Sequence, residues 1–234
     1  MTVRVTREAE PQIELYGAFS GELVGGGKRT LTFTPTGTYL TMVVKNSLSK
    51  VQVEQGSFKT SYIPTKDAVK TRSTDVARIP TSAFGYNDEG GTVVCDFSMS
   101  FDGTNFPRVW EIGSTINNQD RINLYGHAPD KRIGCGFLTA NTNQAGFTLS
   151  TNNTIPTAQT KVAFAWEENN VAAVQDGGTV QQDTSATLKG GNPRTSMGLG
   201  YTTGFSSDIM NGHIKSIQYY PRRLTNAQLQ ELTT

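Results

Sequence analysis

The sequence predicts an all-β protein: an antiparallel β-sandwich that follows a small β-rich module and ends in one short helix. Short segments in which apolar and polar residues alternate recur along the 234 residues, and such alternation is typical of strands with one buried face. Turn-forming residues separate these segments, among them 24 Gly and 9 Pro. A series of short strands with a single helix favours two antiparallel sheets packed face to face.

The first module is predicted at residues 1–65. Strands are expected at residues 12–16, 30–34, 39–44 and 50–54, and the segments GGGK, PTGT and NSLS between them have turn chemistry. Short strands in this number bury little apolar surface by themselves. We therefore expect the module to pack on the next domain or on another protein chain.

Residues 54–79, EQGSFKTSYIPTKDAVKTRSTDVARI, form the junction between the two modules. This stretch carries no amphipathic helix and no catalytic signature. Pro64 stiffens the chain within it and Pro80 follows it directly. The sequence thus predicts a linker at residues 66–79 and a second domain at residues 80–234.

The strongest strand signal of the second domain lies at residues 91–101, where Val93, Cys95, Phe97, Met99 and Phe101 all point to one face. Further strands are expected at residues 108–113, 120–125, 132–138, 146–150, 161–167, 170–175, 178–182, 196–201 and 212–220. The dipeptide of Asp176 and Gly177 suits a hairpin turn with positive φ.

A helix is predicted at residues 226–232. Thr225, followed three residues later by Gln228, fits a capping box, and Leu224 with Leu229 fits the hydrophobic staple around a helix start. The helix is expected to pack Leu229 and Leu232 onto the sandwich.

Composition and charge exclude several classes of partner. The net charge is +1, without the basic stripe that binding to a phosphate backbone needs, so no nucleic acid is expected. The N-terminus lacks the apolar core of a signal peptide, and no apolar run approaches the roughly 18 residues of a membrane span. Cys95 and Cys135 lie in apolar or Gly-rich strands, which favours buried free thiols, although a disulfide between them remains open.

Two stretches resemble known families. The closing segment GHIKSIQYYPRRLTNAQLQELT, with WEENNVAAVQDGGTVQQD before it, resembles the concanavalin A-like, laminin-G-like jelly-roll superfamily over residues 80–234. The junction VQVEQGSFKTSYIPT, followed by AVKTRSTDV, resembles the linker of tailed-bacteriophage tail fibres and minor tail proteins. In those proteins the linker joins a sandwich like a carbohydrate-binding module to a laminin-G-like domain. Residues 1–65 would match only the closing strands of that first sandwich.

The resemblance implies a non-enzymatic virion protein, made in the bacterial cytoplasm without a signal peptide. Residues 1–65 would attach to other virion proteins, and a homo-oligomer, with a trimer favoured, is implied by analogy with phage fibres. The jelly roll would adhere to bacterial surface glycan on a tail fibre or as a surface decoration. The alternative is a purely structural, capsid-stabilising component without a glycan ligand.

Enzymatic activity is not predicted. The laminarinase branch of the superfamily carries E-x-D-x-x-E on one strand, with its carboxylates about 5 Å apart, and this chain lacks that motif. Glu111 with Asp96 is a conceivable pair if their strands are neighbours. A polysaccharide-degrading, glucanase-like enzyme is therefore the third reading. No metal site is predicted from the two histidines, and the oxygen-rich calcium candidates are Asp102, Asn105 and Asp120.

Glycan binding by a β-sandwich requires aromatic faces for stacking on sugars and planar polar side chains for their hydroxyls. The candidates are Trp110, Asn117, Asn118, Asp120, Arg121, Tyr125, His127 and Asn143. Trp110 shares its strand face with Ile112, so it either packs in the core or faces a ligand.

Overall fold

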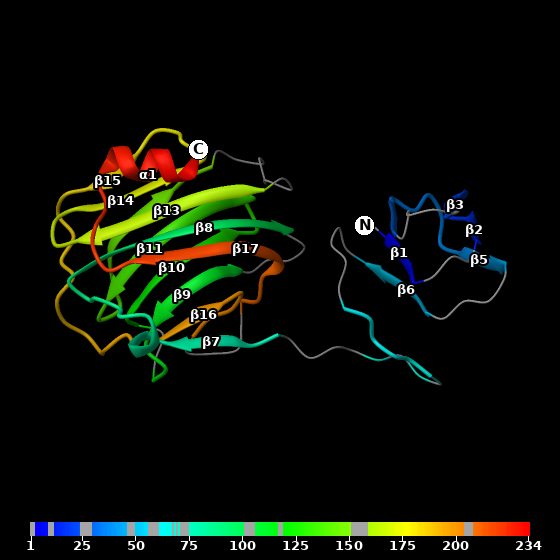
Figure 1. Ribbon diagram of the computed structural model, residues 1–234, viewed down its shortest axis with the longest axis horizontal. Coiled ribbons are helices and arrows are strands. Elements are labelled where there is room, and N and C mark those ends of the chain that lie inside the picture. Colours follow the sequence, from blue (N-terminus) through cyan, green and yellow to red (C-terminus); the bar gives the residue numbers. More distant parts are fainter. Residues whose placement is uncertain are drawn as a thin grey trace. The chain divides into compact units, whose positions relative to one another are not determined.

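The computed structural model describes residues 3–8, 12–23, 30–45, 50–55, 61–66, 68, 70, 75–100, 106–116, 119–150, 159–203 and 208–234. The chain divides into two compact units, Met1–Ser73 and Thr74–Thr234 (Figure 1). The predicted calcium candidates Asp102 and Asn105 and the predicted glycan candidates Asn117 and Asn118 lie outside the described residues.

The first unit consists of two three-stranded antiparallel sheets, in the orders β4-β1-β6 and β3-β2-β5. Its strands are β1 (Val3–Glu8), β2 (Gln12–Gly17), β3 (Gly21–Leu23), β4 (Thr30–Phe33), β5 (Leu40–Lys45) and β6 (Lys50–Gln55). Ile13, Leu15 and Phe33 are buried at its centre. The sequence predicted four of these strands and missed β1 and β3.

The second unit is a sandwich of two antiparallel sheets, which confirms the predicted fold class. One sheet has six strands in the order β12-β11-β10-β9-β16-β7, and the other has five in the order β15-β14-β13-β8-β17. The strands are β7 (Ala77–Pro80), β8 (Gly90–Ser100), β9 (Arg108–Gly113), β10 (Arg121–His127), β11 (Arg132–Thr139), β12 (Thr142–Thr148), β13 (Thr160–Glu167), β14 (Val171–Gln175), β15 (Gln181–Asp183), β16 (Ser196–Leu199) and β17 (Asn211–Tyr220). The predicted linker at residues 66–79 thus includes the start of β7.

Apolar side chains from both sheets fill the space between them. Val93, Cys95, Phe97 and Met99 of β8 are fully buried, as their alternation predicted. They belong to one hydrophobic cluster with side chains of β9, β10, β11 and β13. Burial raises the pKa of the Cys95 thiol and also that of Cys135, and both cysteines are free.

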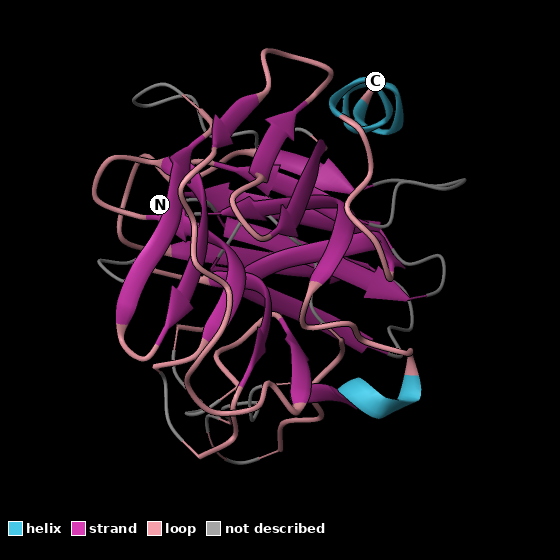
Figure 2. Cartoon of the chain, turned by 90° about the vertical axis from the view of Figure 1, so that its left-hand side faces the viewer, coloured by secondary structure: helices cyan, strands magenta, loops and turns pink. Residues whose placement is uncertain are grey.

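Helix α1 (Asn226–Thr233) covers the outer face of the five-stranded sheet, and its capping box forms as predicted. The Thr225 hydroxyl accepts a hydrogen bond from the Gln228 N–H at 3.3 Å, and the Gln228 side-chain oxygen accepts one from the Thr225 N–H at 3.0 Å. Leu224 and Leu229 are buried against the alanine-rich face of β13 and β14. Besides α1, Figure 2 shows only the short 3₁₀ turn η1 (Thr81–Ala83) as helix among the described residues. No helix in the described part of the chain is long and apolar enough to cross a membrane.

Candidate functional site

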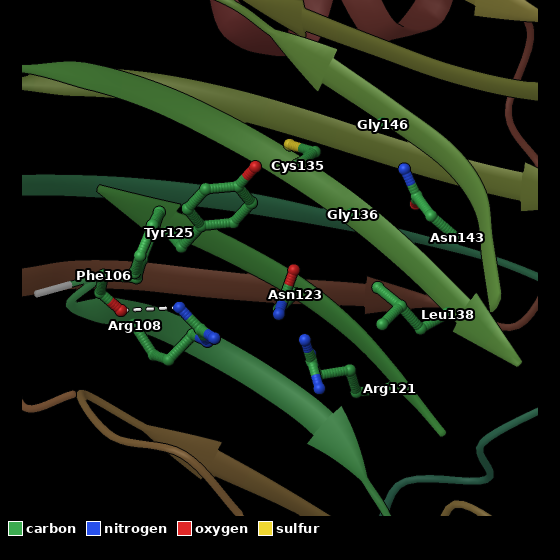
Figure 3. Close-up of a pocket in the computed structure, with 10 residues that line it drawn as sticks. All are labelled: Phe106, Arg108, Arg121, Asn123, Tyr125, Cys135, Gly136, Leu138, Asn143 and Gly146. Atoms are coloured by element: carbon green, nitrogen blue, oxygen red, sulfur yellow. Dashed lines mark hydrogen bonds between the residues drawn. The ribbon is translucent and has the colours of Figure 1, made fainter. Parts of the chain in front are cut away.

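A groove of about 320 Å³ opens on the outer face of the six-stranded sheet (Figure 3). Ile122 and Leu124 of β10 point into the core, so Arg121, Asn123 and Tyr125 between and beside them point outward. The main side chains that line the groove are those of Arg108, Arg121, Asn123, Tyr125, Leu138 and Asn143. The volume lies at the lower end of the roughly 300–1,000 Å³ that small-molecule sites occupy.

Glycines shape this groove. On the outer face, Gly136 of β11 pairs with Asn123 of β10 and with Gly146 of β12. A Cβ atom on Gly136 would lie 2.9 Å from Asn123 Oδ1, and one on Gly134 would lie 2.7 Å from Cζ of the Tyr125 ring. The missing side chains therefore leave the depression open and let the Tyr125 ring lie directly on β11.

A buried carboxylate, Glu111 of β9, organises the base of the groove. Its Oε1 accepts hydrogen bonds from the Thr203 N–H and the Thr203 hydroxyl, both at 2.8 Å. Its Oε2 accepts hydrogen bonds from Arg108 Nε at 3.2 Å and Asn123 Nδ2 at 3.4 Å, and lies 4.0 Å from Arg121 Nε. Glu111 is 0% exposed, so this carboxylate holds neighbouring side chains and does not itself meet solvent.

The guanidinium of Arg108 is bonded to other groups of the protein around the groove. Besides its bond to Glu111, its Nη1 donates to the Phe106 carbonyl at 2.5 Å, and its Nη2 lies 3.7 Å from Asp208 Oδ2. Its guanidinium carbon also lies 5.4 Å from the centre of the Tyr125 ring, which is a cation–π distance. Arg108 thus fixes the position of Tyr125.

Arg121 is the cation that the groove presents. Its side chain is 18% exposed, against 7% for Arg108. Burial lowers the pKa of Arg121; Glu111 opposes this shift, and the nearby charge of Arg108 adds to it. The guanidinium nevertheless stays charged near neutral pH. Figure 3 shows Arg108, Asn123 and Arg121 pointing toward one another, with Asn143 across the groove.

Asn123 supplies an acceptor beside this cation. Its Oδ1 is buried and has no hydrogen-bond partner among the described residues. The side chain was not among the predicted candidates, although it shares the outward alternation of Arg121 and Tyr125. An acceptor without a partner next to guanidinium and amide donors suits a ligand that carries hydroxyl groups.

The structure gathers some of the predicted site residues and separates others. Arg121, Tyr125 and Asn143 line the groove, and His127 lines a smaller pocket beside Tyr125. The prediction was wrong for Trp110, which is 0% exposed within the core. The face that Trp110 shares with Ile112 is the inner one, so its ring meets no ligand.

The prediction of Asp120 as a glycan-binding or calcium-binding residue was also wrong, because its carboxylate accepts hydrogen bonds from within the fold. Its Oδ1 accepts from the Ala140 N–H at 2.7 Å, and its Oδ2 accepts from the N–H and the side-chain amide of Asn192 at 2.9 and 3.1 Å. These donors occupy the oxygens that a sugar or calcium would need. In the described part of the chain, no group of three or more His, Cys, Asp or Glu side chains is placed to hold a metal ion.

The carboxylate pair considered for catalysis does not form. Asp96 lies on β8 of the five-stranded sheet, where its Oδ2 is 3.3 Å from Lys215 Nζ. Glu111 lies on β9 of the opposite sheet. The two strands are not neighbours, and each carboxylate has a separate set of partners.

Gly191→Ala is expected to destabilise the second unit. Gly191 has φ +75°, and a Cβ atom there would lie 1.8 Å from Asp120 Oδ1. Gly200→Ala is the matched control, since Gly200 has φ +79° and no described atom within 4 Å of such a Cβ. Backbone strain alone should lower the free energy of unfolding of the control by about 1–2 kcal/mol. Gly191→Ala should lower it by at least about 2 kcal/mol more, because the added Cβ atom displaces a hydrogen-bonded carboxylate. Equal losses in urea denaturation would contradict this.

Asp120 is expected to make stability depend on acidity. Burial alone would raise the pKa of Asp120, but the N–H groups of Ala140 and Asn192, the Asn192 amide and the charge of Arg194 outweigh it and lower that pKa. The stabilisation is therefore full above the unfolded pKa of about 3.9 and is lost as pH falls through the lower folded value. The difference in unfolding free energy between wild type and Asp120→Asn should stay constant from pH 7 to about 4.5 and shrink below about 3.9. A constant difference down to pH 2 would contradict the assignment.

No protein-family model and no curated protein matches the sequence. Solved structures similar to this chain include the CBM40 of the Ruminococcus gnavus IT-sialidase. Its complex with α2,3 sialyllactose has a TM-score of 0.53 and 18% identity, over 65% of this chain and 86% of that chain. Its complex with α2,6 sialyllactose has a TM-score of 0.55 and 16% identity, over 70% and 96%.

The NanB sialidase of Streptococcus pneumoniae also matches, with a TM-score of 0.52 and 14% identity, over 66% of this chain but only 26% of that chain. At these identities the likeness establishes the fold. The β-sandwich jelly-roll fold is thus shared with these solved structures.

Proposed function

We propose that the second unit binds a glycan in the groove on the outer face of its six-stranded sheet. The observation that carries the proposal is the meeting of an aromatic ring, a guanidinium group and carboxamide groups in one depression, from Tyr125, Arg121, Asn123 and Asn143. Glycan binding needs these groups together. The likeness in fold to a module solved with sialyllactose supports the same reading.

The side chains around the groove have different roles in the proposed binding of a glycan. The face of Tyr125, held by Arg108 and by the glycine strand beneath it, offers an apolar surface for a sugar ring. Arg121 and the Asn143 amide donate hydrogen bonds, and the Asn123 oxygen accepts one. Among the described residues that line the groove, Arg121 is the more exposed of the two charged side chains, which favours a sugar that bears a carboxylate.

The test is a glycan array that carries neutral and sialylated sugars, probed with the full chain, followed by calorimetry on each positive glycan. Gly136→Val should abolish binding, because its added side chain fills the groove. Gly37→Val is the matched control: a Cβ atom there meets Ala18 only at ordinary contact distances of 3.6 Å and more. If no glycan and no bacterial surface binds, the proposal fails and the jelly roll is a spacer without a ligand.

The finer part of the proposal places this glycan-binding unit on a bacteriophage particle, with residues 1–65 attached to other virion proteins. It is supported by the resemblance of the junction at residues 54–79 to phage tail linkers. Display in several copies would strengthen weak single-site binding to a cell surface. Gold-labelled antibodies against the chain should decorate phage particles in electron micrographs. Particles without label from a lysate that contains the chain would contradict this placement.

A further inference from the structure

A second, smaller pocket lies beside the groove on the same face of the sheet. It has a volume of about 50 Å³ and is lined by Tyr125, His127, Arg132, Ile133, Gly134 and Thr148. Tyr125 lines both pockets. The two depressions are therefore neighbours that share this ring as a common wall.

The register of the sheet places the second pocket in line with the first. Outward side chains of β10 follow one another as Arg121, Asn123, Tyr125 and His127, about 6.6 Å apart at the rise of a strand. Across the sheet, Tyr125 pairs with Gly134, and His127 pairs with Arg132. The row from Arg121 to His127 spans about 20 Å, which is longer than one sugar ring.

The two basic side chains of the second pocket, His127 and Arg132, lie beside a shared carboxylate. Asp130 Oδ2 lies 2.8 Å from His127 Nδ1 and also pairs with the Arg132 guanidinium. The His127 and Arg132 side chains are 22% and 31% exposed, so both reach solvent while Asp130 orients them. A fixed imidazole and guanidinium at the rim of a small depression are hydrogen-bond donors for oxygen atoms.

The Tyr125 ring, which lines both pockets, forms an aromatic ridge with the Phe106 ring beside it. The Phe106 ring lies 4.8 Å from the His127 ring and 6.2 Å from the Tyr125 ring. Phe106 is 43% exposed, so an apolar surface extends from the groove toward His127. A ligand that passes over this ridge stays in contact with protein along its length.

We infer that the ligand is an oligosaccharide that crosses this ridge, with one sugar residue in the groove and an oxygen-bearing substituent of the adjacent residue in the second pocket. This inference rests on the proposed glycan binding. A volume of about 50 Å³ exceeds what one water molecule needs but is far below that of the groove. It therefore suits a substituent such as a hydroxymethyl or carboxylate group, held by His127 and Arg132.

The test is an array that displays hexoses, hexosamines, uronic acids and sialic acid, each as the monosaccharide and as oligosaccharides. The wild-type chain should bind the oligosaccharide of its preferred sugar at least tenfold more tightly than the monosaccharide. We call this ratio of oligosaccharide affinity to monosaccharide affinity the gain. His127→Ala and Arg132→Ala should each remove most of the gain and change monosaccharide affinity less than twofold. Asp130→Asn keeps the His127 and Arg132 donors but removes the carboxylate that orients them, so it should lower the gain as well. Lys215→Ala, on the opposite sheet, is the control for loss of a positive charge and should leave the gain intact.

The outcomes separate the two proposals. Binding of a monosaccharide and its oligosaccharides with equal affinity would overturn the second pocket and leave glycan binding in the groove intact. The same holds if His127→Ala and Arg132→Ala keep the full gain. Absence of binding to every displayed glycan would overturn both. Thermal unfolding of each variant ensures that a loss of affinity is not a loss of fold.

Discussion

Glu111→Gln is expected to lower the free energy of unfolding by about 3 kcal/mol, because removing one partner of a buried ion pair leaves uncompensated charge. The glutamine oxygen can still accept from the N–H and hydroxyl of Thr203. Its amide group, however, would face the donors of Arg108 and Asn123, which in the wild type bond to Glu111 Oε2. Urea denaturation, with a shifted midpoint at unchanged slope, measures the loss.

Asp96→Asn provides the matched control for this substitution. Asp96 also lies on a central strand and is largely buried, but its ion-pair partner Lys215 has a side chain that is 65% exposed. Pairs with such an exposed partner contribute about 0–1 kcal/mol. If Glu111→Gln costs no more than Asp96→Asn, the network around Glu111 does not stabilise the sheet.

Arg121→Ala is expected to weaken glycan binding about tenfold to a hundredfold. A hydrogen bond to a charged group contributes about 1.5–3 kcal/mol, and about 1.4 kcal/mol corresponds to a factor of ten in affinity. Calorimetry with the glycan selected on the array measures the change. Stability should change less than with Glu111→Gln, because the Arg121 side chain is partly exposed and its distance to Glu111 is long, at 4.0 Å.

Two further variants identify the cause of the loss. Lys215→Ala removes the same charge from the opposite sheet and should leave affinity unchanged. Arg121→Lys keeps the charge but loses the planar donor pair of the guanidinium, so it should recover only part of the affinity. Equal losses for Arg121→Ala and Lys215→Ala would show that net charge, and not contact in the groove, governs binding.

The sequence predicted most of the sandwich because large apolar residues recur at every second position along strands such as β8 and point to the core between the sheets. The alternation from Val93 to Met99 matches β8 well, and the pattern of Thr225 and Gln228 predicted the start of α1. The strand β3 has three residues, which is too short for a period of two to be seen. The strand β7, most of which fell in the predicted linker, takes its place in the sheet by pairing with β16, which is distant in sequence.

The site was harder to predict because it depends on register between strands. The sequence selected Arg121, Tyr125 and His127 for their side-chain chemistry, and a period of two along the predicted strand would have added Asn123. Nothing local shows that Glu111 would face Asn123 across β9 and β10, or that Thr203 would approach it from a loop 92 residues further along the chain. The side of the sheet on which Trp110 lies was equally undetermined until the inner face was known.

The glycines beneath the groove separate recognition from folding. Gly134, Gly136 and Gly146 shape the depression through side chains that they lack, while the inner face of the same sheet carries the apolar core. Side chains added at these positions would fill or reshape the depression on the outer face, and none of them would point into the space between the sheets. The shape of the outer face can therefore change while the apolar core on the inner face keeps its side chains.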